Sequence, residues 1–191
     1  VTRVDGPIAI IGGGIAAASL AEALARRGRT ITVFARGGWA AGASSAPLGL
    51  VTPRLEAADR PHARALLNAF DYAVDLYRRR GLLDASGVLR VASKDGGDRL
   101  RRLSGLLDER YDWLDATAAS RRIGAPSSAG LWMAAAGSVR PADVVAALAA
   151  GTPARDIEIR AVTEAGEGGW RLTGADGSTH GPFAAVIVAG G

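Results

Sequence analysis

The sequence contains no cysteine, and its 191 residues include only two histidines, His62 and His180. The absence of cysteine excludes disulfides, thiolate nucleophiles and thiolate-ligated metal ions, and two histidines are too few for a histidine cluster around a metal. We therefore expect no bound metal, and any redox chemistry must come from an organic cofactor.

Long apolar runs are also missing. No stretch approaches the roughly 20 residues that a membrane span needs, and Val1–Asp5 lacks the apolar core of a signal peptide. With 48% hydrophobic and 22% charged residues, the composition is typical of a globular domain. We expect a cytoplasmic protein without a membrane partner.

Lysine is nearly absent, because all of the 23 basic residues except Lys94 are arginine. The arginines gather in four clusters, at 26–29, 78–80, 99–102 and 121–122. The first two fall at the ends of predicted helices, where positive charge stabilises the helix dipole. With a net charge of +4, the clusters allow a polyanionic partner but do not require one.

Glycine, in contrast, is concentrated where it is most informative, between an apolar strand at Ile8–Ile11 and an apolar helix that starts at Ile15. Gly12 permits a tight turn, Gly14 lets the backbone approach a phosphate, and Ala17 keeps strand and helix close. The N–H groups of Gly13, Gly14, Ile15 and Ala16 then attract an anion at the helix start. This pattern predicts a pyrophosphate site of a dinucleotide-binding fold.

The second strand of this unit, Thr30–Phe34, lacks a residue that the fold ordinarily carries. An acidic residue about 20 positions after the first glycine accepts hydrogen bonds from the ribose, whereas here that place holds Ala35, followed by Arg36. Arg36 could contact the 2′-phosphate of NADP, or it could be one more exposed arginine. We favour the second interpretation in this arginine-rich chain.

Further elements follow by periodicity and by helix-ending residues. The helix from Pro61 to Gly81 carries a core stripe, and His62 in its first turn is expected to be solvated. Helices are also predicted at 98–111 and 141–150, and strands at 88–92, 130–134, 157–162, 170–173 and 184–189, the last of them a buried strand. These elements predict an α/β fold.

The order of these features resembles the FAD-dependent D-amino-acid-oxidase-like oxidoreductases, the family of glycine and sarcosine oxidases. The residues that carry the resemblance lie in five segments: 8–17, 41–51, 87–90, 137–144 and 186–191. The resemblance implies a Rossmann-like FAD/NAD(P)-binding domain at 1–50 and 140–191, incomplete at its C-terminus. It also implies the start of a mixed-sheet substrate domain at 51–139.

The resemblance further implies FAD as cofactor and oxidation of a C–N bond in a small amine or amino acid. Leu67–Phe70 and the Gly-Ala-Ser loop are most similar to members that act on the carboxymethylaminomethyl group of a tRNA wobble uridine, so tRNA is a candidate partner. Two alternatives remain: an NADP-binding protein using Arg36, and a non-catalytic remnant that binds RNA or another partner.

The resemblance assigns cofactor contacts position by position. Gly12, Gly13 and Gly14 match the pyrophosphate turn, and the loop that passes the flavin matches Ser44, Ser45 and Gly49. The backbone of Val162 is expected to face the adenine, and the closing turn contributes Ala189 and Gly190. Ala35 and the pair Ala46-Pro47, where relatives often have Asn-Arg, depart from the family pattern. No catalytic side chain is assigned.

Overall fold

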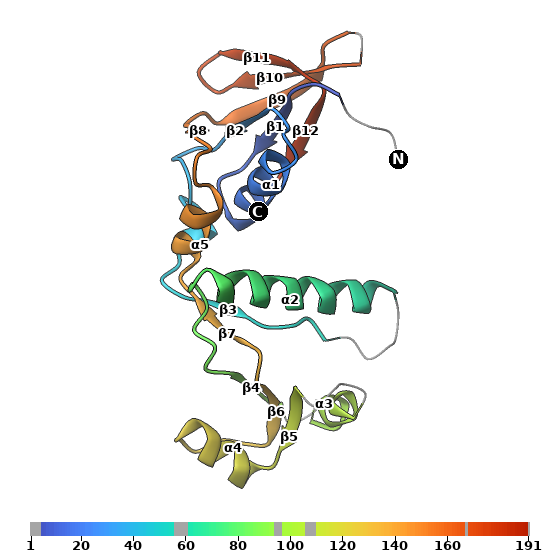
Figure 1. Cartoon of the computed structure of the whole chain (residues 1–191), viewed down its shortest axis with the longest axis vertical. Coiled ribbons are helices and arrows are strands. Elements are labelled where there is room, and N and C mark those ends of the chain that lie inside the picture. The colour runs from blue at the N-terminus through green and yellow to red at the C-terminus, as the bar shows by residue number, and fades with distance from the viewer. Residues whose placement is uncertain (1–4, 56–60, 94–96, 106–109, 167, 191) are drawn as a thin grey trace. The chain divides into compact units, whose positions relative to one another are not determined.

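The computed structural model describes residues 5–55, 61–93, 97–105, 110–166 and 168–190. The chain forms two compact units, one from Val1–Pro47 together with Arg140–Gly191 and one from Leu48–Val139. Figure 1 shows the elements of each unit. Among the described residues, no helix is both long and apolar enough to cross a membrane.

The first unit is built on a parallel sheet with strand order β12-β1-β2-β8. Its strands are β1 (Ile8–Ile11), β2 (Ile31–Phe34), β8 (Ala154–Arg155) and β12 (Ala185–Val188). Helix α1 (Ile15–Ala25) connects β1 to β2, and α5 (Pro141–Leu148) packs against α1. The parallel β1-α1-β2 unit confirms the predicted α/β class.

Successive side chains of a strand point to opposite faces of a sheet, and this alternation divides the core of the first unit. Ile10 and Val33 pack with Ala17 and Ala21 of α1 on one face. On the other face, Ala9 and Phe34 contact an antiparallel meander through Leu172 and Phe183. The meander consists of β9 (Ile159–Glu164), β10 (Trp170–Gly174) and β11 (Thr179–Phe183).

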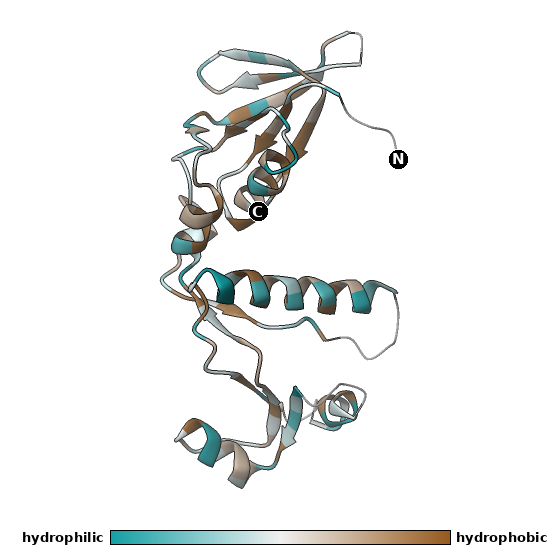
Figure 2. Ribbon diagram, viewed as in Figure 1, coloured by the Kyte–Doolittle hydropathy of each residue, from teal (hydrophilic) through white to brown (hydrophobic). Residues whose placement is uncertain are grey.

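The second unit contains two antiparallel sheets. Strand β3 (Gly49–Val51) pairs with β7 (Gly137–Val139), and the order β4-β6-β5 joins Val88–Val91, Gly130–Met133 and Tyr111–Leu114. The described residues of this unit also form the helices α2 (Pro61–Arg79), α3 (Gly97–Ser104) and α4 (Ala116–Ile123). Figure 2 shows apolar and polar residues alternating along α2, as expected of a helix with one buried face.

The predicted core stripe of α2 is confirmed, since Phe70, Val74 and Tyr77 are buried, and His62 is exposed as expected. The predicted helix at 98–111 is wrong at its end. Tyr111 instead begins strand β5 and lies opposite Met133 of β6. Tyr111 and Trp113 both pack on the sheet, which is the every-second-residue pattern of a strand and not that of a helix. The leucine spacing of the same predicted helix places Leu106 and Leu107 in the core, and Asp59-Arg60 is the predicted entry to the helix at Pro61. These four residues lie outside the described part of the chain.

Two strands also differ from the predictions. Strand β9 begins at Ile159 rather than at residue 157. Strand β12 is not buried, and its Val188 is 71% exposed. The reason is that β12 pairs with β1 on one side and, among the described residues, lies at the edge of its sheet.

Candidate nucleotide-binding site

A pocket of about 370 Å³ opens in the first unit where β1 and β2 end and α1 begins. Its volume is within the range of small-molecule sites. Ligands of open parallel sheets bind outside the carboxyl ends of the strands, which is where this pocket lies. Its lining brings together residues that are far apart in the sequence, among them Gly12, Arg36, Glu158 and Ala189.

The three glycines between β1 and α1 have different surroundings. At Gly12, which has a φ of 136°, an added Cβ would lie 2.5 Å from the carbonyl oxygen of Ala189. A Cβ at Gly13 would lie 2.5 Å from the carbonyl oxygen of Gly38. At Gly14 the nearest atom would be the Oγ of Ser44, 3.1 Å away. Packing against the backbone therefore requires glycine at the first two positions, whereas at the third an added Cβ would meet only the side-chain hydroxyl of Ser44.

The start of α1 is arranged to hold an anion. Gly14 is its N-cap, no side chain of the cap residue closes the helix, and the first turn carries no acidic residue. The buried Ser44 reaches the helix from 29 residues away, and its Oγ accepts a hydrogen bond of 3.2 Å from the N–H of Ile15. Other first-turn N–H groups have no intrahelical acceptor, and the helix dipole favours negative charge there.

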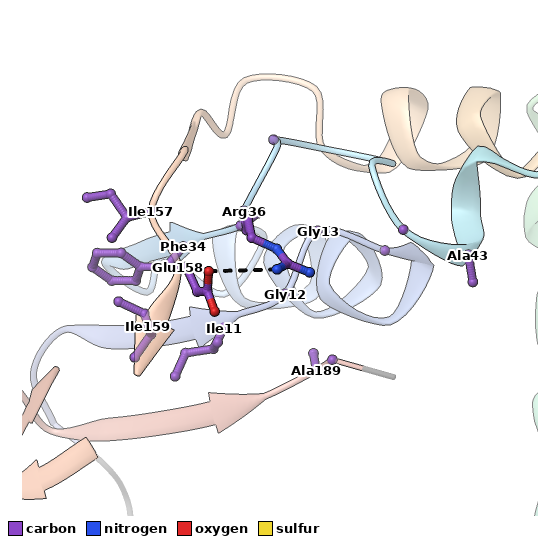
Figure 3. Close-up of a pocket in the computed structure, with 15 residues that line it drawn as sticks. Ile11, Gly12, Gly13, Phe34, Arg36, Ala43, Ile157, Glu158, Ile159 and Ala189 are labelled. Atoms are coloured by element: carbon purple, nitrogen blue, oxygen red, sulfur yellow. Dashed lines mark ion pairs between the residues drawn. The ribbon is translucent and has the colours of Figure 1, made fainter. Parts of the chain in front are cut away.

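Ala35 and Arg36 lie at the end of β2, on the rim of the same pocket. Ala35 is only 3% exposed, and its side chain has no polar atom. The guanidinium Nη1 of Arg36 lies 3.7 Å from Oε2 of Glu158, and Figure 3 shows the two side chains directed toward each other. Both side chains are largely exposed, at 77% and 44%.

Backbone contacts bring Glu158 to this place from the connection between β8 and β9. The N–H of Ala35 donates to the carbonyl of Arg155 at 2.9 Å, and the N–H of Gly37 donates to Oδ1 of Asp156 at 2.6 Å. These bonds fix the loop after β2 against residues 155–158. The Arg36–Glu158 pair is a consequence of that contact.

Apolar side chains form one end of the pocket: Ile11, Phe34, Ile157 and Ile159. Phe34 is fully buried, the ring of His180 lies 4.9 Å from its ring, and Arg155 lies 5.7 Å from its centroid. This end can accept a flat, weakly polar group such as a nucleotide base. Sequence reasoning missed these residues and Glu158, because nothing in the separate segments indicates that they meet.

The pocket brings together seven of the predicted cofactor residues, namely Gly12, Gly13, Gly14, Ala35, Arg36, Ala189 and Gly190. Ile15 and Ala16 are in the first turn of α1, beside the pocket lining. Ser44 lies against that turn, and the adjacent Ser45 is exposed. Val162 is 38% exposed on β9, opposite Leu172, and Gly49 belongs to β3 of the second unit.

A cluster of Asp176, Ser178 and His180 lies apart from the pocket lining, at the turn from β10 to β11. The Oγ of Ser178 is 2.5 Å from Oδ1 of Asp176 and 2.9 Å from Nε2 of His180. The Ser178 hydroxyl lowers the pKa of Asp176. In a nucleophilic triad the carboxylate binds the histidine rather than the serine, so this cluster stabilises a turn. Among the described residues, no group of acidic and histidine side chains could hold a metal ion.

Comparison with known proteins identifies the family. Residues 7–191 match the family described as DAO, FAD dependent oxidoreductase. The tRNA 5-methylaminomethyl-2-thiouridine biosynthesis bifunctional protein of Maricaulis maris is 40% identical over 167 residues, and its Magnetococcus marinus counterpart is 35% identical over 197. These matches cover 87% and 96% of this chain but only 26% and 29% of the two relatives.

Solved structures show the same fold. Glycine oxidase from Geobacillus kaustophilus matches with a TM-score of 0.74 at 24% identity, over 97% of this chain and 55% of its own. Fructosyl peptide oxidase from E. terrenum matches with a TM-score of 0.80 at 19% identity, over 100% of this chain and 50% of its own. The glycine turn, the parallel sheet and the match over residues 7–191 agree, and the chain belongs to the DAO family of FAD-dependent oxidoreductases.

Proposed function

We propose that this chain binds FAD and forms the cofactor-binding part of an oxidoreductase that acts on the C–N bond of an amine or amino acid. The observation that carries the proposal is the turn at Gly12–Gly14 before α1, which lines a pocket of about 370 Å³. When bound, FAD would supply the hydride-accepting chemistry, and the protein would supply binding and orientation.

The residues of the pocket fit the adenosine diphosphate part of FAD. Gly14 and the first turn of α1 would hold the pyrophosphate, since they offer N–H groups and no negative charge. Ile11, Ile157 and Ile159, which are only partly buried, would contact the adenine. Gly13, Ala189 and Gly190 add little side-chain bulk, so the backbone can approach the cofactor closely.

The proposal assigns residues 1–50 and 140–191 to FAD binding and residues 51–139 to the start of a substrate domain. Its support is the division of the chain, in which one unit contains every residue that lines the pocket. Gly49, predicted beside the flavin, falls in the other unit.

For the substrate, we infer the carboxymethylaminomethyl group of a tRNA wobble uridine. The support is the similarity to the two bifunctional relatives, which are named for the biosynthesis of 5-methylaminomethyl-2-thiouridine in tRNA. Exposed arginines at the ends of α3 and α4 would suit an RNA partner. The proposal entails a cytoplasmic location. A small amine such as glycine is the alternative substrate.

Titration of the purified chain with FAD, followed by flavin fluorescence, tests the cofactor assignment. We expect saturable binding that ADP displaces, because the pocket is built for the diphosphate part, and weak binding of NADP. Binding of FAD that ADP does not displace, or no binding at all, would contradict the proposed site. Preferential binding of NADP would favour the alternative use of Arg36.

A further inference from the structure

The pocket has an internal order that matches the order of groups in adenosine diphosphate. Figure 3 shows Phe34, Ile157 and Ile159 together at one end and Ala43 toward the other. The Arg36–Glu158 pair lies between them in this view, and Gly12 and Gly13 line the same pocket. In adenosine diphosphate the ribose lies between base and pyrophosphate. A ribose bound along this pocket would therefore lie beside the Arg36–Glu158 pair.

A buried or partly buried ribose needs an acceptor for its hydroxyl groups, and this fold ordinarily supplies a carboxylate at the end of β2. Ala35 provides none. Among the described residues that line the pocket, only Arg36 and Glu158 carry charged side chains, and Glu158 is the one with acceptor oxygens. The pocket therefore does contain a carboxylate. It belongs to Glu158, in the segment before β9, and not to the end of β2.

The contact between Arg36 and Glu158 is suited to exchange with a ligand. At 3.7 Å between exposed side chains, the pair is held weakly. The backbone of Glu158 is held more firmly, because its carbonyl accepts a hydrogen bond of 2.8 Å from the N–H of Ala175. The carboxylate can therefore turn to a ribose without any rearrangement of the segment.

From this arrangement, and resting on the proposed FAD site, we infer that Glu158 replaces the strand-end carboxylate and accepts hydrogen bonds from the ribose hydroxyls. Its negative charge also offsets that of Arg36 and repels a 2′-phosphate. Glu158 thus selects an adenosine with free ribose hydroxyls, as in FAD, against the 2′-phosphorylated adenosine of NADP. Arg36 is thus the ion-pair partner of Glu158, rather than a contact for a 2′-phosphate or simply one more exposed arginine.

The test compares FAD and NADP binding in the wild-type chain, in E158Q and in E164Q. Glu164 lies at the other end of β9 and outside the pocket lining, so E164Q is a control for the charge change. We expect E158Q to weaken FAD binding about tenfold, the effect of losing one charge-assisted hydrogen bond, and to strengthen NADP binding. A second variant, E158Q/R36Q, should lose the gain in NADP binding. E164Q should change neither affinity.

The outcomes separate this inference from the function on which it rests. Circular dichroism first confirms that E158Q is folded, as expected for an exposed, nearly isosteric change. A wild-type chain that binds FAD, together with an E158Q variant that keeps both wild-type affinities, would overturn the role of Glu158 and leave the FAD site intact. A wild-type chain that binds no FAD would overturn both.

Discussion

At the scale of single residues, three neighbouring glycines have separate reasons for being glycine. The N–H of Gly12 donates to the carbonyl of Phe34, and the carbonyl of Gly13 accepts from the N–H of Ala40, both at 2.8 Å. Those bonds and the neighbouring carbonyls leave no space for a side chain at either position. Gly14 is less confined, because the nearest atom to an added Cβ would be the side-chain Oγ of Ser44 rather than a backbone carbonyl.

A pair of alanine substitutions can separate these two roles. Gly14→Ala places a methyl group 3.1 Å from the Ser44 hydroxyl, a contact that a small shift relieves, so we expect about 1 kcal/mol or less of lost stability. Gly14 lines the pocket at the helix start, so a shift of its backbone should also disturb the proposed pyrophosphate contact, and FAD affinity should fall about tenfold. Thermal unfolding and FAD titration measure the two effects.

Gly12→Ala is the contrasting variant. Its φ of 136° is strained for alanine, and its Cβ would meet the backbone at Ala189, so we expect a loss of at least ~2 kcal/mol in folding free energy. If Gly14→Ala retains the FAD affinity of the wild type, the pyrophosphate does not approach the helix at this residue.

The residues that could be predicted from sequence are those whose signal is local. Gly12 and Gly14 stand between an apolar strand and an apolar helix, and Ala35 is recognisable by its distance from them. Glu158 could not be predicted, because its place depends on the pairing of β8 with β2 and on the bond from Gly37 to Asp156. Those contacts join segments 119 residues apart in the chain.

At the scale of elements, helix α1 depends on a residue that it does not contain. Its N-cap is a glycine, which has no side chain to accept the orphan N–H groups of the first turn. Ser44, in the short 3-10 helix η1 (Ala43–Ser45), accepts the N–H of Ile15 instead. The loop after β2 is therefore part of the anion site as well as a connection.

Ser44→Ala should expose this dependence. Removal of the buried hydroxyl leaves the N–H of Ile15 without its acceptor, and we expect a loss of about 1 kcal/mol in the free energy of unfolding. Amide hydrogen exchange at Ile15 should become faster, and urea denaturation measures the stability. Ser45→Ala, at an exposed position in the same helix, is the control and should change neither quantity. Unchanged exchange at Ile15 would show that the Ser44 contact does not protect the helix start.

Elements differ in how far periodicity determines them. Helix α2 is 19 residues long, and the prediction of its buried stripe holds. Strand β5 is four residues long and follows a helical pattern rich in leucine, so the local pattern favoured continuing the helix. Its pairing with β6 determines the strand, and that pairing is not visible in the local sequence.

At the scale of the whole molecule, arginine clusters occur in both units, and in the second unit they lie at the ends of helices. Arg78 and Arg79 lie in the last turn of α2, where they complement the helix dipole, and Arg79 also pairs with Asp75 at 2.8 Å. The last turns of α3 and α4 carry further pairs at 101–102 and 121–122, all exposed. Helix stability accounts for the position of each pair, whereas their number gives the chain its net charge of +4.

If tRNA is the partner, that charge makes binding dependent on salt. Each phosphate that an arginine neutralises releases counterions, so the logarithm of the association constant should fall with the logarithm of salt concentration by roughly 0.7–0.9 per contact. We expect the R101Q/R102Q/R121Q variant to lower this slope by about one for each of these arginines that contacts a phosphate.

A titration with an anticodon stem-loop at several salt concentrations measures the slope, with a DNA hairpin of the same length as control. Equal affinity for the hairpin would reduce the interaction to a general attraction for polyanions. No binding of the stem-loop even at low salt would remove tRNA as the partner of this chain and leave a small amine as the substrate to test.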